Sequence, residues 1–169
     1  MKYKGRGSKM KILVFSDSHG RAKNIVEALK IHGGVCDFAV FLGDGLKDID
    51  YAREKFPSVP FVSVKGNCDT FLFEGERDEC VLDLDGVRVL ITHGHKYNVK
   101  YGCGTILYRA MELEADAVFF GHTHIPLDTQ EYIGEKRIHL FNPGSVGMGA
   151  SYGIINTSGG VLVSSHGKI

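Results

Sequence analysis

Four short runs, apolar except for Ser63, constrain the fold of this sequence most. Each run ends near a Ser, Gly or Asp, and together they span residues 12–15, 38–42, 61–64 and 118–120. Such runs are typical of strands buried on both faces, as in a parallel sheet. Helical patterns between the first two runs and before the fourth predict two apolar faces, one with Ile25, Ala28, Leu29 and His32 and the other with Leu107, Ala110, Met111 and Glu114. This alternation of strand and helix favours an α/β fold.

The second half of the chain has a different pattern. Asp85-Gly86 stands between two β-rich stretches, which predicts a two-residue hairpin turn and the start of a second sheet. After Pro126, short strands separated by Gly-rich turns are expected at residues 128–133, 137–142, 152–156 and 161–165. We expect these strands to form a β-meander. The domain would then have parallel strands early, antiparallel strands late, and two sheets.

The composition excludes several classes of protein. Hydrophobic residues make up 43% of the 169-residue chain, and no apolar run approaches the ~18 residues of a membrane span, so we expect a soluble protein without a membrane partner. Twenty basic residues balance 20 acidic ones, which leaves no net field to drive nucleic-acid binding and argues against a sequence-specific nucleic-acid partner. Residues 1–9 are polar and without periodicity, so we expect a disordered leader followed by a single domain over residues 10–169.

Cysteine usage indicates a reducing environment. The four cysteines, Cys36, Cys68, Cys80 and Cys103, form no C-x-x-C pair, and no cleavable apolar leader precedes them. A disulfide framework or a zinc ribbon is therefore poorly supported, and we expect the protein in the cytoplasm.

Polar groups that can bind metal ions follow the apolar runs. They are two carboxylates, one amide and five imidazoles: Asp17, His19, Asp44, Asn67, His93, His95, His122 and His124. The carboxyl ends of parallel strands line one crevice, so we expect these groups to meet. Buried charges need partners, and a divalent metal site would supply them. The donors exceed the four that one zinc ion takes, whereas two metal ions sharing a carboxylate would use them all, with Asp44 as the candidate bridge.

Five motifs in this order resemble those of the calcineurin-like metallophosphoesterase superfamily. The motifs are Asp17-x-His19, Gly43-Asp44, Gly66-Asn67-Cys68-Asp69, the strand-ending His93, and Gly121-His122-Thr123-His124. The chain looks most like the small YfcE-like phosphodiesterases of bacteria and archaea, over about residues 10–147 including Asn142-Pro143-Gly144-Ser145. The resemblance implies a four-layer α/β/β/α sandwich of two mixed sheets. It also implies a di-metal centre with Asp17, His19 and His124 on one metal, Asn67, His93 and His122 on the other, and Asp44 bridging.

The function that the resemblance implies is a metal-dependent phosphoesterase, and among these a phosphodiesterase. A hydroxide bridging two metal ions would attack phosphorus in line, with Asp44, Asn67, His93 and His95 as the catalytic residues. Two divalent ions against two aspartates leave about +2, which suits a phosphate-ester small molecule, with a nucleotide as one candidate. Manganese is the favoured metal, and nickel, zinc, iron, cobalt and magnesium also fit. The sequence leaves open whether the protein forms a homo-oligomer.

One motif departs from the wider family. Cys68 stands where that family has a histidine proposed to assist the leaving group, a replacement that small YfcE-like members share. A thiol with a pKa near 8.5 is a poor proton donor to an alkoxide. We therefore expect a preference for activated leaving groups or phosphodiesters, with His95 as a candidate substitute.

Alternatives remain for the function and for several residues. The alternative function is a non-catalytic scaffold like the retromer subunit, which shares the fold but has a degraded metal site, whereas every ligand position is intact here. Asp69 fits either an Asx turn or a carboxylate that orients a metal ligand. His32, His139 and His166 carry no motif around them and are expected to be ordinary surface or core residues.

Overall fold

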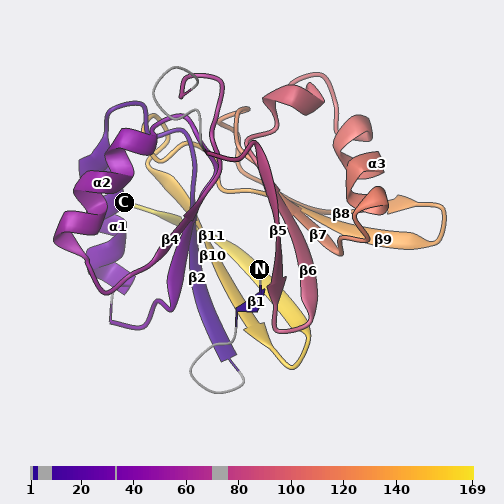
Figure 1. Cartoon of the computed structure of the whole chain (residues 1–169), viewed down its shortest axis with the longest axis horizontal. Helices are drawn as coiled ribbons and strands as arrows, with labels where there is room; N and C mark the ends of the chain where they lie inside the picture. Colours follow the sequence, from indigo (N-terminus) through magenta and orange to yellow (C-terminus); the bar gives the residue numbers. More distant parts are fainter. Residues whose placement is uncertain (1, 4–8, 33, 70–75) are drawn as a thin grey trace.

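The computed structural model describes residues 2–3, 9–32, 34–69 and 76–169. Figure 1 shows four layers: a pair of helices, a five-stranded sheet, a six-stranded sheet and a single helix. The two sheets pack face to face, and both contain parallel and antiparallel neighbours. The predicted α/β/β/α sandwich of two mixed sheets is confirmed.

The five-stranded sheet contains the first three apolar runs. Its order is β11 (Val161–Lys168), β10 (Ser151–Ser158), β2 (Lys9–Phe15), β3 (Phe38–Phe41) and β4 (Phe61–Ser63). Strands β2, β3 and β4 are parallel to one another, whereas β10 is antiparallel to both of its neighbours. The parallel strands therefore end at one edge of the sheet, where the loops that follow them meet.

The six-stranded sheet contains the hairpin that was predicted around Asp85-Gly86. Its order is β1 (Lys2–Tyr3), β5 (Glu79–Leu84), β6 (Val87–Thr92), β7 (Ala117–Phe119), β9 (Lys136–Asn142) and β8 (Leu127–Ile133). Asp85 and Gly86 form the turn between β5 and β6 with φ values of 55° and 86°, the left-handed geometry of a tight hairpin.

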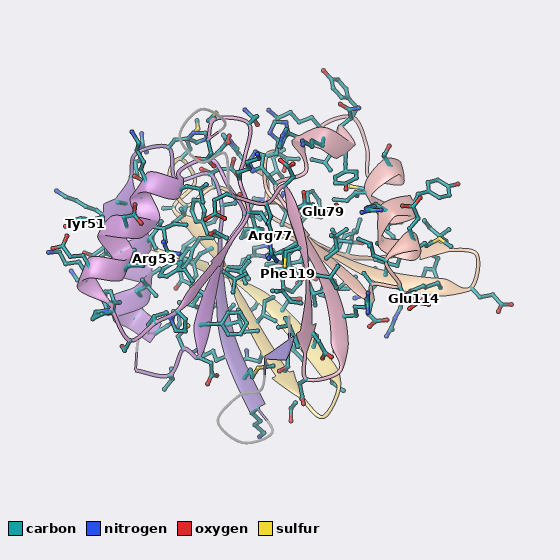
Figure 2. The ribbon with its side chains drawn as sticks, in the orientation of Figure 1. Tyr51, Arg53, Arg77, Glu79, Glu114 and Phe119 are labelled. Carbon is teal, nitrogen blue, oxygen red and sulfur yellow. The ribbon has the colours of Figure 1, made fainter. Side chains whose placement is uncertain are left out.

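Three apolar clusters hold the layers together. The inner one lies between the sheets and includes Ile12, Val89, Phe119 and Phe141, with Phe119 marked in Figure 2. Helices α1 (Ala22–His32) and α2 (Leu46–Lys55) cover the outer face of the five-stranded sheet. Helix α3 (Gly104–Glu112) covers the six-stranded sheet. No helix in the described ranges is long and apolar enough to cross a membrane.

The structure corrects the expected β-meander. Strands β8 and β9 form a hairpin in the six-stranded sheet, whereas β10 and β11 form one in the five-stranded sheet. The segment over residues 143–150 crosses from one sheet to the other between them. The two hairpins therefore belong to different layers, which the local strand pattern does not reveal.

The apolar face predicted for α3 was wrong in part, because the buried face lies about one residue closer to the start of the helix than expected. Ile106, Leu107 and Ala110 are buried, whereas Met111 and Glu114 are exposed. The helix ends at Glu112, so Glu114 lies beyond its last turn.

The amino terminus also differs from the expected disordered leader. Strand β1 pairs in parallel with the end of β5, and Lys9 already belongs to β2. The remaining residues of that predicted leader, 1 and 4–8, lie outside the described residues.

Candidate metal centre

The loops after β2, β3, β4, β6 and β7 meet at one end of the two sheets, at the top of Figure 1. Two groups of side chains there place their ligand atoms within 4.8 Å of one another: Asp17, His19 and His124 in one, and Asp44, His93 and His122 in the other. The geometry thus brings together the side chains that were assigned as metal ligands from the sequence.

In the first group, two imidazoles face one carboxylate. Nε2 of His124 lies 3.1 Å from Oδ1 of Asp17 and 3.3 Å from Nε2 of His19. Asp17 is fully buried, and its Oδ1 accepts no hydrogen bond from the described residues, whereas its Oδ2 accepts the backbone N–H of His122. A buried carboxylate oxygen without a donor is costly unless a cation neutralises it.

In the second group, Nε2 of His93 is the central atom. It lies 3.4 Å from Oδ2 of Asp44, 3.2 Å from Nδ1 of His122 and 3.2 Å from Oδ1 of Asn67. The other ring nitrogen of His93 is 2.7 Å from the carbonyl oxygen of Leu42. Because a carbonyl can only accept, Nδ1 carries the proton and Nε2 is left free to bind a cation.

Asp44 lies between the two groups. Its Oδ2 is 3.9 Å from Nε2 of His19 in the first group and 3.4 Å from Nε2 of His93 in the second. Its Oδ1 accepts the backbone N–H of Cys68 at 2.8 Å. One buried carboxylate oxygen therefore faces imidazoles of both groups, which is the position that a bridging ligand requires.

The backbone at these positions is unusual. Asp17, His19, Asp44, His122 and His124 have φ values between 45° and 65°. Asp and His tolerate this left-handed region better than most residues, yet each instance costs about 1–3 kcal/mol. Strain of this kind persists where the surrounding structure enforces it, and here it directs the side chains to a common centre.

Two glycines lie so close to the carboxylates that a side chain at either position would clash with its surroundings. A Cβ atom at Gly66 would lie 2.1 Å from Oδ1 of Asp44, and one at Gly121 would lie 1.9 Å from Oγ of Ser16 and 2.9 Å from Oδ2 of Asp17. Such contacts are far below van der Waals separation. Glycine at both positions is therefore required by close approach.

The sequence left open whether Asp69 forms an Asx turn or orients a metal ligand, and its hydrogen bonds decide between these roles. Its carboxylate accepts four backbone N–H groups, those of Asp44, Gly45, Leu46 and Gly66, at 2.7–3.0 Å. All four donors are main-chain groups, and through them Asp69 fixes the loops that present Asp44 and Asn67. Its role is to position the ligand loops.

Other polar residues that support the site were not predicted from the sequence. The hydroxyl of Ser18 and the N–H of Gly20 both donate to Oδ2 of Asp48, in the first turn of α2. The amide of Asn142 donates to the carbonyl of Gly121 at 2.8 Å. These contacts hold the loops that carry His19, His122 and His124. Their partners are far apart in sequence, so no local signal identifies them.

Ser145 holds the end of β2 in the same manner. Its hydroxyl donates to the carbonyl of Asp17 at 2.8 Å, and the N–H of Val146 donates to the carbonyl of Ser16. The motif that contains Ser145 was noted in the sequence only as part of the resemblance. Its structural role is to fix the Asp17 loop from the crossover segment that precedes β10.

The protonation states suit metal binding. Burial alone would raise the pKa of Asp44, but the hydrogen bond and charge of His93 and the N–H of Cys68 outweigh it and hold this pKa well below its usual range. Burial and the charge of nearby His93 lower the pKa of His122 to about 4. Burial would lower the pKa of His93, yet the two neighbouring carboxylates raise it. Around neutral pH, the site therefore offers an ionised Asp44 and a neutral His122.

Two further predicted residues lie at the edge of the site. The ring of His95 stands 5.4 Å from that of His93 and 6.2 Å from that of His122, and burial followed by the charge of His93 lowers the pKa of His95. Cys68 is exposed, and its Sγ lies within 4.8 Å of ligand atoms of His19 and Asp44. Burial and the hydrogen bond to Asp44 raise the pKa of the Cys68 thiol to about 11. Neither side chain is among the two principal ligand groups.

The remaining histidines have partners away from this site. Nε2 of His32 lies 2.9 Å from the hydroxyl of Tyr152, and Nε2 of His139 lies 2.7 Å from Oδ1 of Asp128. His166 stacks on Phe141. Each of these three histidines thus has a partner elsewhere in the fold, and that they are ordinary structural residues stays a prediction.

Buried carboxylates, imidazoles and an amide at the ends of strands from two packed sheets define a metal-binding α/β protein. The domain pattern of the calcineurin-like phosphoesterase superfamily matches residues 10–160. The chain belongs to this superfamily.

Individual relatives agree with that assignment. YsnB of Bacillus subtilis, named a probable metallophosphoesterase, is 35% identical over 139 residues, which cover 81% of this chain and 75% of that protein. A crystal structure of a predicted phosphoesterase from Streptococcus pneumoniae is 25% identical, with a TM-score of 0.72 over 94% of this chain and 98% of that one.

A second similar structure shows the fold alone. Vacuolar protein sorting 29 from Cryptosporidium parvum is 14% identical, with a TM-score of 0.71 over 95% of this chain and 98% of that one. The same architecture thus supports proteins of quite different sequence.

Proposed function

We propose that this protein is a metal-dependent phosphodiesterase with a two-metal centre. The observation that carries the proposal is the position of Asp44, whose Oδ2 faces Nε2 of His19 and Nε2 of His93 at 3.9 and 3.4 Å. Asp17, His19 and His124 would hold one divalent ion, and Asn67, His93 and His122 the other. When bound, such a pair supplies positive charge to the phosphoryl oxygens and activates a water for in-line attack on phosphorus.

The buried Oδ1 of Asp17, which accepts no hydrogen bond from the described residues, supports the fit to a cation. Asp17 and Asp44 would neutralise about half of the charge of two divalent ions, and the remaining +2 attracts a phosphate ester. The Leu42 carbonyl holds the ring of His93 in the tautomer that binds metal through Nε2. Asp69 and Asn142 keep the ligand loops in place before any substrate arrives.

We propose diesters rather than monoesters as the substrates because of Cys68. Its thiol remains protonated well above neutral pH and is a weak acid, because its pKa is raised to about 11. Monoesters of poorly activated alcohols need a proton donor for the leaving oxygen. His95, beside His93 and His122, is the candidate to orient the leaving group, but its lowered pKa makes it a weak donor as well.

Several finer features belong to the same proposal. Manganese is the favoured metal, since oxygen and imidazole donors together suit it, with nickel, zinc, iron, cobalt and magnesium as alternatives. A nucleotide is one candidate substrate. The four free cysteines fit a reducing compartment such as the cytoplasm. A homo-oligomer is compatible with all of these features.

The direct test is hydrolysis by protein stripped of metal and then reloaded. Bis(p-nitrophenyl) phosphate and p-nitrophenyl phosphate are offered with Mn²⁺, Ni²⁺ or Zn²⁺, and Asp44→Asn is compared with Asp50→Asn, a change at an exposed carboxylate on α2. We expect metal-restored activity that favours the diester, is lost in Asp44→Asn and is kept in Asp50→Asn.

A non-catalytic scaffold is the second candidate. The likeness in fold to vacuolar protein sorting 29 favours it. Tight metal binding with no turnover of either ester by the wild-type protein would support this alternative.

A further inference from the structure

An apolar groove lies against the loop that carries His122 and His124, and none of the predicted ligands lines it. Its volume is about 330 Å³, within the range of small-molecule sites. The residues that line it are mainly apolar: Val99, Lys100, Cys103, Phe120, Thr123, Ile125 and Leu127. Ile125 is 68% exposed, so part of this apolar surface faces solvent.

Both walls of the groove are continuous with loops that carry metal ligands. Thr123, in one wall, stands between His122 and His124, and Ile125 follows His124 directly. In the other wall, Val99 packs over Gly94, where a Cβ atom would lie only 2.9 Å from Cγ2 of Val99. Gly94 directly follows His93. A group attached to a phosphoryl bound at the metal centre could therefore extend into the groove.

The groove has one positively charged lining residue, Lys100. Within the described residues, Lys100 forms no ion pair. Thr123 is the other lining side chain with a strong hydrogen-bonding group, so the rest of the groove suits an uncharged, apolar group.

We propose that this groove binds a planar ring on the ester group of the substrate. The proposal rests on the proposed function, since it requires that the metal centre bind a phosphoryl group. It narrows the substrate class to phosphate esters of ring-bearing groups, aryl groups or nucleosides, and disfavours esters of small polar alcohols such as glycerol. A glycerol group would leave its hydroxyls without partners against Ile125 and Leu127.

Binding of two phosphonates to the manganese-loaded protein tests this proposal. Phenylphosphonate and methylphosphonate carry the same charged group and differ in the ring alone, and neither can be hydrolysed as an ester. Calorimetry should show tighter binding of phenylphosphonate. Adenosine 5′-monophosphate against ribose 5-phosphate, as competitive inhibitors of diester hydrolysis, asks whether a nucleobase is also accepted. A preference in both pairs indicates nucleosides, and a preference for the phenyl ring alone indicates aryl esters.

Matched variants assign the preference to the groove. Ile125→Ser should weaken phenylphosphonate binding roughly threefold to tenfold, the effect of losing part of an apolar contact, and leave methylphosphonate binding unchanged. Ile31→Ser is the control, because Ile31 is 61% exposed on α1, away from the groove. Lys100→Gln should leave the ratio of the two phosphonate affinities unchanged, because the ring is expected to contact the apolar lining residues.

Three results would overturn the proposal, and they are distinguishable. Equal affinities for the two phosphonates, or a ring preference that Ile125→Ser leaves intact, would contradict the groove assignment alone. A change of oligomeric state in Ile125→Ser without a change in phosphonate preference would assign the surface to contact between copies of the chain. Failure of the metal-loaded protein to bind either phosphonate would contradict the proposed function together with the groove.

Discussion

The carboxylate of Asp69 accepts the backbone N–H of Asp44 at 2.7 Å, across 25 positions of sequence. The candidate bridging ligand is thus held by a second aspartate that contacts its main chain. Three further backbone N–H groups, from Gly45, Leu46 and Gly66, donate hydrogen bonds to the same carboxylate. This single buried side chain fixes two of the loops that form the site.

Replacing Asp69 should damage metal binding and stability together. Asp69→Asn removes one acceptor oxygen and introduces an NH₂ group that faces N–H donors, which should cost about 2–4 kcal/mol of unfolding free energy. Because supporting residues of metal ligands are worth about 10–100-fold in affinity, metal binding should fall by a factor in that range. Denaturant unfolding and metal calorimetry measure the two effects. Asp50→Asn serves as the control, and equal behaviour of the two variants would contradict the role given to Asp69.

A methyl group at Gly66 should displace the bridging carboxylate. Its Cβ would lie 2.1 Å from Oδ1 of Asp44, so Gly66→Ala should lower metal affinity by roughly tenfold or more. Gly104→Ala is the matched control, because no atom lies within 4 Å of a Cβ there and the position begins α3. The control should be neutral or stabilising by up to ~1 kcal/mol. Undiminished metal affinity in Gly66→Ala would show that metal binding does not depend on the observed position of the Asp44 carboxylate.

Metal binding should release a proton from His93. Two carboxylates raise the pKa of this imidazole in the empty site, so it keeps its proton to a higher pH than an ordinary histidine. A metal ion needs the neutral ring. Affinity should therefore fall as pH decreases through the raised pKa, and proton release should be greater at pH 6.5 than at pH 8.5. Calorimetry in buffers of different ionisation enthalpy measures the release, and its absence at both pH values would argue against His93 as a ligand.

The leaving-group preference should change when an acid is restored at position 68. Cys68→His should speed hydrolysis of esters with poor leaving groups, such as phenyl phosphate, by roughly tenfold or more, because general acids contribute about 10²–10⁴-fold. Rates on p-nitrophenyl esters should change little. Cys68→Ser removes the thiol without supplying an acid and should show neither effect. An unchanged ratio of rates in Cys68→His would mean that the missing acid does not set the preference.

Much of this fold could be predicted because its buried strands leave strong local signals. The apolar run at residues 12–15 lies within β2, and Asp85-Gly86 forms the expected turn between β5 and β6. The face of α3 was harder to predict, since Ile106 and Met111 are both apolar and the sheet alone decides which is buried. The assignment of the two late hairpins to different sheets depends on a crossover that strand periodicity does not encode.

The candidate site could be predicted at the level of its ligands but not of its support. Asp17, Asp44 and His93 each follow a strand, and parallel strands bring such positions to one edge. Asp48 and Asn142 stabilise the ligand loops through hydrogen bonds to residues 28 and 21 positions away. Those contacts exist only after the layers have packed, so the sequence alone could not assign them. The groove beside Ile125 likewise arises from two loops that meet in space.

Metal stoichiometry measured together with activity tests the central claim most directly. Metal-stripped protein is titrated with Mn²⁺ while bound metal and the rate of bis(p-nitrophenyl) phosphate hydrolysis are followed in parallel, for the wild type and for Asp44→Asn. The account predicts that activity reaches its plateau at two ions per chain and that Asp44→Asn neither binds the pair tightly nor turns over substrate. Full activity in the stripped protein, or an Asp44→Asn variant that binds two ions and hydrolyses the diester like the wild type, would contradict it.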